Sequence, residues 1–293
     1  MLDRTQFFGL PPVDAAQADA LILPLPLEKT VTYGAGTHTG PQAILDASVQ
    51  IELFDEETLL DFTRRPRLLT LPPLGPDPAM TAELVPEYLD AVARYVKGLP
   101  EKFLLSLGGE HTITYGVVSG LADPADVTIV QIDAHADLAD TLGGRHWSHG
   151  TVMRRLWDRG CRLIQIGIRS LSQPEHELVR TGGRIETYFA HQLAGQWDRL
   201  LEKLGGLKGK VYLSLDVDGL DPAILPSTGT PQPNGLSWTQ TMAIVRAVAS
   251  APCQWIGADV VEFVASPSPP GCDPTAARLV MKLLAWRTVK GTV

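Results

Sequence analysis

The sequence predicts an α/β protein, a three-layer α/β/α sandwich with a mostly parallel central sheet. Apolar runs of strand length alternate along the chain with amphipathic segments of helix length. Several of these runs are apolar almost throughout, which is typical of strands that helices cover on both faces. Because one α/β domain commonly reaches 293 residues, we expect residues 1–293 to form a single domain.

The expected strands are the short apolar runs Ala20–Leu25, Arg67–Leu71, Lys102–Leu107, Val127–Asp133, Arg162–Ile168, Lys210–Asp216 and Gln254–Val261. The expected helices lie between or after them, where apolar residues recur at helical spacing. They are Pro41–Leu53, Thr81–Lys97, Thr114–Leu121, Gly150–Asp158, Pro174–Val179, Gln196–Leu204, Ser237–Ala249 and Pro274–Trp286. The proline-rich stretches Leu71–Pro78 and Pro267–Pro270 are expected to form surface loops.

Composition excludes several classes of protein. No apolar run reaches the ~18 residues that a membrane-spanning helix needs, and the first residues lack the pattern of a secretory signal. A net charge of −8 argues against a nucleic-acid partner and is compatible with a small cationic substrate. Cys161, Cys253 and Cys272 are far apart in the sequence, so we expect reduced thiols, the first two in the core, and a cytoplasmic location.

Candidate metal ligands follow three of the expected strands. One strand runs into Asp133, His135 and Asp137, which point the same way on extended backbone because side chains alternate. A second ends in Asp216 and Asp218, again two residues apart. A third leaves through Gly108-Gly109-Glu110-His111, where glycines allow a sharp bend. Ligands of such sheets bind beyond the carboxyl ends of the strands, so these groups are expected to converge.

Four aspartates in one patch repel each other unless cations lie among them. Four carboxylates and two imidazoles suffice for two divalent ions if some carboxylates bridge. Hard oxygen donors with one histidine for each ion favour Mn²⁺, with Ni²⁺, Co²⁺ and Fe²⁺ as open alternatives. Any one of these aspartates alone would be read as a turn former or a helix cap; the combination predicts a binuclear metal site.

The same motifs resemble those of the ureohydrolase (arginase/agmatinase) family, most of all agmatinases. Three segments of this chain resemble the metal-binding signatures of that family: QIDAHADL (Gln131–Leu138), SLDVDGLDP (Ser214–Pro222) and LGGEH (Leu107–His111). Further similar segments cover most of the chain: Thr30–Ser48, Trp147–Arg155, Gly167–Ser170, Thr228–Ser237 and Asp259–Phe263. The resemblance implies the arginase-like fold, hydrolysis of a guanidino group to urea and an amine, and a homotrimer or homohexamer.

The resemblance also implies a role for each matching position. One Mn²⁺ would be held by His111, Asp133, Asp137 and Asp216, and the other by His135, Asp133, Asp216 and Asp218. His149 matches the histidine that moves protons, Glu262 the carboxylate that grips the guanidinium, and Thr230 a threonine of the substrate pocket. His146 and Trp147 are candidates for the wall of the pocket entrance, with ordinary loop packing as the alternative.

The implied chemistry is metal-assisted hydrolysis. Two metal ions that share a water lower its pKa toward neutrality, and Asp137 is placed to orient it as hydroxide. Glu262 would set the approach to the guanidinium carbon, and His149 would protonate the departing amine.

Two arginase recognition groups are missing from this chain. Where arginases carry an asparagine and an aspartate for the amino-acid head, the sequence has Ala139 and the run Ser170-Leu171-Ser172. This favours agmatine, hydrolysed to putrescine and urea. The alternatives are aminopropylagmatine, guanidinobutyrate, a formiminoglutamase-type reaction, and a non-catalytic relative, which the full set of matching residues argues against. Ser227 and Gln232 depart from the family pattern near the pocket, as Glu110 does beside His111.

Overall fold

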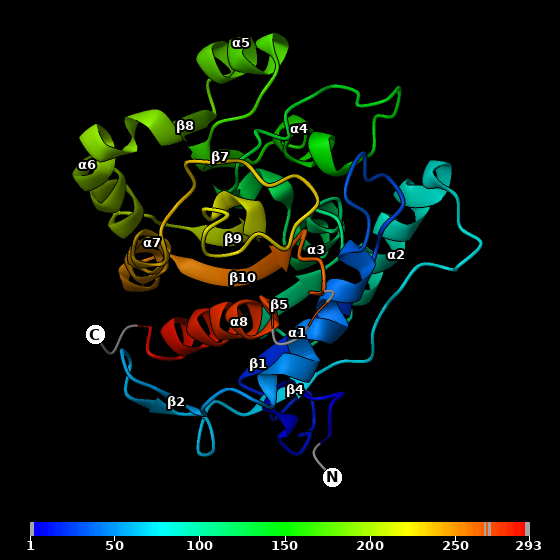
Figure 1. Cartoon of the computed structure of the whole chain (residues 1–293), viewed down its shortest axis with the longest axis vertical. Helices are drawn as coiled ribbons and strands as arrows, with labels where there is room; N and C mark the ends of the chain where they lie inside the picture. Colours follow the sequence, from blue (N-terminus) through cyan, green and yellow to red (C-terminus); the bar gives the residue numbers. More distant parts are fainter. Residues whose placement is uncertain (1–2, 267, 269–270, 291–293) are drawn as a thin grey trace.

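Eight parallel strands form the central sheet of the protein (Figure 1). The computed structural model describes residues 3–266, 268 and 271–290. Across the sheet the strands lie in the order β4 (Leu68–Thr70), β1 (Ala20–Leu25), β5 (Phe103–Gly108), β10 (Gln254–Val261), β9 (Lys210–Asp216), β6 (Val127–Ile132), β7 (Arg162–Ile168) and β8 (Ile185–Phe189). The strand pairs of this sheet are all parallel among the described residues, because helical crossovers return the chain to the same edge.

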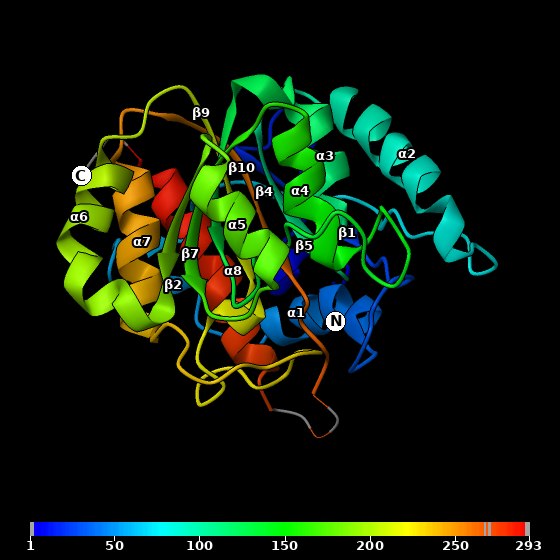
Figure 2. The ribbon, with the colours of Figure 1, turned by 90° about the horizontal axis from the view of Figure 1, so that it is seen from above.

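Helices cover both faces of the sheet (Figure 2). One layer holds α1 (Gly40–Ser48), α6 (Leu193–Gly205), α7 (Trp238–Ser250) and α8 (Asp273–Thr288). The other holds α2 (Val85–Lys97), α3 (Ile113–Leu121), α4 (Val152–Asp158) and α5 (Gln173–Thr181). The predicted three-layer α/β/α class is thereby confirmed.

Short elements connect these layers. The 3₁₀ segments are Phe7–Gly9, Thr37–Thr39, Ala82–Leu84, Pro124–Asp126, His149–Thr151, Ala190–Gln192 and Val217–Gly219. A separate antiparallel pair consists of β2 (Phe54–Asp55) and β3 (Leu60–Asp61). Among the described residues, no helix is both long and apolar enough to cross a membrane.

Alternate side chains of the buried strands feed two hydrophobic cores. In β1, Ile22 packs into the core beneath α1 and α8, whereas Leu21 and Leu23 pack into the core beneath α2 and α3. Burying one such side chain contributes about 1.5–3 kcal/mol, so a strand apolar on both faces is held from both sides. Cys161 and Cys253 are buried free thiols, as the sequence predicts.

Several predicted boundaries were wrong. The helix expected over Pro41–Leu53 ends at Ser48, and the one expected from Thr81 becomes α-helical only at Val85. The sequence analysis missed β8, because this outermost strand is only half-buried and keeps polar residues. It also missed the two-residue strands of the β2–β3 pair. The proline-rich stretch at 267–270 lies, apart from Ser268, outside the described residues.

The fold brings the predicted functional segments together at one edge of the sheet. His111 follows β5, Asp133 follows β6, Asp216 ends β9 and Glu262 follows β10. These four strands are the neighbours β5-β10-β9-β6 in the middle of the sheet. The carboxyl ends of central parallel strands are the usual place for a ligand in such folds.

Candidate metal centre

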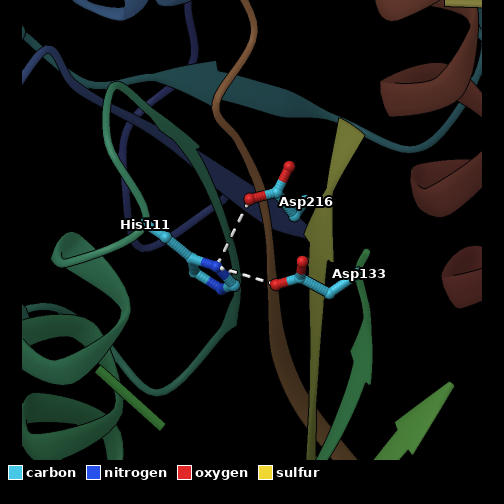
Figure 3. Close-up of side chains that lie close together, drawn as sticks. All are labelled: His111, Asp133 and Asp216. Carbon is cyan, nitrogen blue, oxygen red and sulfur yellow. Dashed lines mark ion pairs between the residues drawn. The ribbon is translucent and has the colours of Figure 1, made fainter. Parts of the chain in front are cut away.

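His111 lies at the centre of a buried group of carboxylates (Figure 3). Its Nδ1 atom is 3.2 Å from Asp133 Oδ2, 2.9 Å from Asp137 Oδ2 and 3.5 Å from Asp216 Oδ2. The close-up shows the imidazole projecting from the turn after β5 toward Asp133, which follows β6, and Asp216, which ends β9. The glycine before Glu110 makes this turn possible, since a Cβ at Gly109 would collide with the carbonyl oxygen of Leu27.

A second group adjoins the first and shares Asp133 with it. His135 Nδ1 is 3.0 Å from Asp218 Oδ2 and 3.8 Å from Asp133 Oδ1. Each of two groups has ligand atoms close enough together to hold one ion. The first group is His111, Asp133 and Asp216, and the second is Asp133, His135 and Asp218. The structure thus brings all six predicted ligands together, with Asp137 beside His111 in the first group.

The residues fit divalent cations on electrostatic grounds. Burial, together with the charges of Asp137 and Asp218, raises the pKa of Asp133 to about 7. Burial and the charges of Asp218 and Asp133 raise the pKa of Asp216 well above its usual range. His111 Nδ1 is buried without a well-aligned hydrogen bond, although three carboxylates surround it. Oxygen donors with one imidazole in each group suit a pair of divalent ions, which would remove this repulsion.

A buried hydrogen-bond chain orients His111. Ser214 Oγ donates to Asp259 Oδ1 over 2.8 Å, so its lone pairs are free to accept from His111 Nε2, also at 2.8 Å. Asp259 is fully buried and also accepts hydrogen bonds from Thr114 and Tyr212. Without metal, burial opposes the charge of His111, but hydrogen bonds to Asp133, Asp137 and Asp216 outweigh it and raise the pKa of His111 well above its ordinary value. With a proton only on Nε2, the imidazole would offer its Nδ1 lone pair to a metal ion among these carboxylates.

Two predicted site residues have left-handed backbone. The φ angles are 54° at Asp137 and 62° at Glu262, a conformation that costs non-glycine residues about 1–3 kcal/mol and tends to persist at functional sites. Glu262 is held from both ends: its N–H donates to Gly109 O at 2.8 Å, and its Oε1 accepts from the N–H of His111 at 2.6 Å. The strain therefore aims a buried carboxylate at the cluster.

A cavity of about 250 Å³ opens onto the two groups. Its wall contains most of the predicted site residues, namely His111, His135, Asp137, Asp216, Asp218, His149, Thr230 and Glu262, while Asp133 lies fully buried behind them. Thr230 Oγ1 is 3.4 Å from Asp218 Oδ2, and the Nδ1 of His149 is buried without a hydrogen-bond partner among the described residues. Thr32, Ala139, Leu142, Ser170, Leu171 and Ser172 also line the cavity.

Sequence reasoning missed Glu175, which lines the same cavity and is mostly buried. Its carboxylate accepts hydrogen bonds from the N–H groups of Leu138 at 3.0 Å and Ser172 at 2.7 Å. The local signal is a capping box at the start of α5, which indicates only a helix N-terminus. Nothing in that pattern indicates that the helix begins beside the metal groups.

Two predicted substrate contacts are not brought to the site. His146 and Trp147 do not belong to the cavity wall. The His146 side chain is 60% exposed and lies near Asp140, and the Trp147 ring packs edge-on against Tyr115 with centroids 4.7 Å apart. The 3₁₀ turn after them directs His149, instead of these two residues, into the cavity. Ordinary loop packing, the alternative interpretation, describes their surroundings.

Arg169 joins three loops of the site. Its guanidinium donates to the carbonyl oxygens of Asp218 at 2.6 Å, Gln232 at 2.9 Å and Pro233 at 2.9 Å. Burial lowers the pKa of Arg169, and the neighbouring aspartates partly offset this effect. One planar cation thus fixes the Asp218 turn against the loop that carries Thr230.

Metal binding is expected to release protons. Burial alone would lower the pKa of His135, but the hydrogen bond and charge of Asp218 outweigh it and raise this pKa to about 9. The metal-free protein therefore holds a proton on His135 at pH 7, and ligation must displace it. Between pH 7 and 9 the Mn²⁺ affinity should rise about tenfold per pH unit for each displaced proton. Calorimetric titration in two buffers of different ionisation enthalpy measures the release; equal heats in both would contradict it.

Comparison with known proteins shows a common family. The sequence profile of the arginase family matches residues 18–285. The chain is 34% identical over 280 residues to an N(1)-aminopropylagmatine ureohydrolase of Synechocystis sp., covering 92% of this chain and 90% of that protein. It is 30% identical over 285 residues to an agmatinase of Halalkalibacterium halodurans, covering 92% and 93%.

Solved structures agree with this relationship. The agmatine ureohydrolase of Thermoplasma volcanium superposes with a TM-score of 0.83 at 28% identity, covering 94% of this chain and 92% of that one. The fold and the sequence similarity over most of the chain therefore agree. The chain belongs to the arginase family of ureohydrolases, enzymes that hydrolyse carbon–nitrogen bonds of linear amidines.

Proposed function

We propose that this protein hydrolyses agmatine to putrescine and urea with two Mn²⁺ ions. The proposal rests chiefly on one observation: six candidate ligand side chains, a histidine and a further carboxylate lie in the wall of one cavity or, for Asp133, buried behind it. His111, Asp133, Asp137 and Asp216 would hold one ion, and His135, Asp133, Asp216 and Asp218 the other. Mn²⁺ follows from the preponderance of oxygen donors, with Ni²⁺, Co²⁺ and Fe²⁺ as alternatives.

When bound, such an ion pair supplies a nucleophile from water at neutral pH. Glu262 would grip the guanidinium and hold its carbon in line for attack, since a carboxylate can accept two parallel N–H bonds. Asp137, beside His111, would accept a hydrogen bond from the attacking water and orient it. His149 would donate the proton that the departing amine needs, because imidazole titrates in the neutral range.

The charge of the site favours a cation. The four candidate metal-binding aspartates and Glu262 carry five negative charges, one more than the four positive charges of two divalent ions. Glu175 adds a further negative charge to the wall. A guanidinium is attracted to such a cavity, whereas an anionic substrate is repelled.

The outer wall favours a substrate without a carboxylate. Ala139, Ser170 and Ser172 offer no cationic partner to an amino-acid head, and Glu175 would repel a carboxylate placed beside it. Agmatine meets this condition, and guanidinobutyrate and formiminoglutamate do not. Aminopropylagmatine also meets it and is the second candidate, because a relative that acts on it has higher identity than the agmatinase compared above.

We further propose that residues 1–293 form one domain that assembles as a homotrimer or homohexamer in the cytoplasm. The family resemblance supports the assembly, and the reduced cysteines support the location. A small cationic guanidino compound would be the partner, without nucleic acid or membrane.

A urea-release assay on the Mn²⁺-loaded enzyme tests the substrate. We expect kcat/KM for agmatine or aminopropylagmatine to exceed that for arginine by about a hundredfold, because the extra carboxylate finds no partner in the cavity. Guanidinobutyrate should be at least about tenfold worse than agmatine for the same reason. A tenfold preference for guanidinobutyrate would overturn the proposal, and higher kcat/KM with aminopropylagmatine than with agmatine would select the second candidate.

A further inference from the structure

A larger cavity lies at the opposite end of the sheet from the metal centre. Its volume is about 710 Å³, within the usual range for small-molecule sites. The wall is formed where β1, β5, β9 and β10 begin, and by the ends of α2, α3 and α8. None of its lining residues belongs to the cavity at the metal groups, so the two are separate.

Cationic side chains gather in this cavity although the chain as a whole is acidic. Lys97, Lys102, Arg159, Lys210 and Arg287 line it, against Asp19, Glu101 and Asp123. Asp19 is already neutralised by Arg67, whose Nη2 lies 3.0 Å from Asp19 Oδ1. Within the described part of the chain, the three lysines form no ion pair within 4.0 Å, although the charge of Lys102 helps to lower the pKa of Asp19. The wall therefore carries an uncompensated positive charge.

Arg287 is a cation of this wall with an unsatisfied buried nitrogen. It is partly buried, and its guanidinium carbon lies 5.2 Å from the centre of the Phe103 ring. Its Nε is buried without a hydrogen-bond partner, and burial lowers the pKa of the guanidinium. No carboxylate among residues 3–266, 268 and 271–290 pairs with it. A partly buried guanidinium without an acceptor costs stability unless an anion or water completes it.

One ordinary explanation, the helix dipole, falls short. Lys97 and Arg287 lie in the last turns of helices, where basic residues often complement the helix dipole. That effect does not require side chains of several helices to surround one cavity. The floor is also irregular: β10 shifts register between Trp255 and Gly257, and the extra residue, Ile256, faces the cavity. Bulges are over-represented next to active sites, among other places in a sheet.

We propose that this cavity binds a small oxyanion with at least two negative charges, a phosphate or a dicarboxylate. Arginine forms paired hydrogen bonds with both kinds of group, and the Phe103 ring holds the Arg287 plane ready for them. Lys102 directly precedes β5 and Lys210 begins β9, the two strands that flank β10, and both supply further charge to the cavity wall. The site is independent of the substrate assigned to the metal centre.

Calorimetric titration of the Mn²⁺-loaded enzyme tests the site, with inorganic phosphate and succinate as probes at constant ionic strength. We expect saturable binding of one ion per chain that saturating agmatine does not displace. Tighter binding of phosphate would identify a phosphate site, and tighter binding of succinate a dicarboxylate site. Binding of neither probe, or displacement by agmatine, would overturn the proposal.

Variants locate the binding. Arg287→Met should weaken the affinity at least tenfold, whereas Arg94→Met should leave it unchanged, since Arg94 is an exposed arginine in the last turn of α2 outside the cavity. If Arg287→Met does not fold, the double variant Lys102→Gln/Lys210→Gln in the cavity wall should still weaken binding at least threefold. If the folded variant, either Arg287→Met or Lys102→Gln/Lys210→Gln, binds the ion with the affinity of the wild type, the ion binds elsewhere and the proposal is overturned.

Discussion

Asp216→Asn is expected to abolish the second metal ion and lower urea release by more than about a hundredfold. Changes to groups that only orient a ligand already cost about ten- to a hundredfold, and Asp216 would contact both ions directly. Its carboxylate lies 3.5 Å from His111 Nδ1 and its Oδ1 accepts the N–H of Asp218, so the amide fits the space while losing the charge. Metal content per chain and kcat with agmatine are the measurements.

Stability of the metal-free protein separates this effect from misfolding. Burial and neighbouring carboxylates raise the pKa of Asp216, so the amide removes a repulsive charge and should not destabilise the metal-free fold. The stabilisation by Mn²⁺, about 2.7 kcal/mol at a hundred times the Kd, should shrink in the variant. Asp140→Asn is the control: this exposed aspartate pairs with Arg155 outside the cavity and should retain kcat within about threefold. Two ions per chain and full activity in Asp216→Asn would refute the ligand assignment.

Lys282→Met is expected to be the most destabilising single substitution of a charged residue away from the metal centre. The lysine is 1% exposed, and its Nζ lies 2.7 Å from Asp55 Oδ2, 3.0 Å from Glu56 Oε1 and 3.0 Å from Glu57 Oε1. These contacts join α8 to the β2–β3 pair. Removing the cation leaves the fully buried Asp55 with only its hydrogen bonds from Thr58 and no cationic partner. Breaking a buried ion pair in this way costs about 3–5 kcal/mol. We expect about 3 kcal/mol, because Glu56 and Glu57 keep one side of the group in contact with water.

Lys203→Met is the control, because Lys203 forms an ion pair of the same N–O distance as Lys282 but is much more exposed. Its Nζ also lies 2.7 Å from a carboxylate, that of Glu186, but its side chain is 46% exposed, so its loss should cost less than about 1 kcal/mol. Urea unfolding of the wild type and both variants gives the two free energies. Asp55→Asn combined with Lys282→Met should recover part of the loss, since no buried charge then stays unpaired. Equal effects of the two lysine substitutions would contradict the argument.

The pKa values of Lys282 and Asp55 together determine how the loss of stability in Lys282→Met depends on pH. Burial opposes the charge of Lys282, but hydrogen bonds to Asp55, Glu57 and Glu56 raise its pKa, so its contribution is complete below the ordinary lysine pKa and is lost at higher pH. Burial likewise opposes the charge of Asp55, but the hydrogen bonds from Lys282 and Thr58 lower its pKa, so its contribution is lost only as the pH falls below the ordinary range for aspartate. The difference between wild type and Lys282→Met should therefore be constant across the neutral range.

The strand-end motifs were predictable because their periodicity is local. Side chains two residues apart on extended backbone share a side, and this predicted that Asp133, His135 and Asp137 act together. The structure groups them on a different backbone, since β6 ends at Ile132 and Asp137 has a left-handed conformation. The helices and most strands were predictable for a similar reason, since buried runs are apolar. The half-buried strand β8 and the early end of α1 escaped, because their bounds depend on contacts with distant segments.

The sequence by itself determined the fold class, the family resemblance and the residues that meet at the metal groups. Only the tertiary structure decided that β5, β10, β9 and β6 are neighbours, which brings His111 to Asp216 across a hundred residues of chain. It also turned His146 and Trp147 away from the cavity and placed Glu175 and the basic cavity where they are. A local pattern fixes which way neighbouring side chains point, whereas the position of a loop or a helix end depends on packing between segments far apart in the chain.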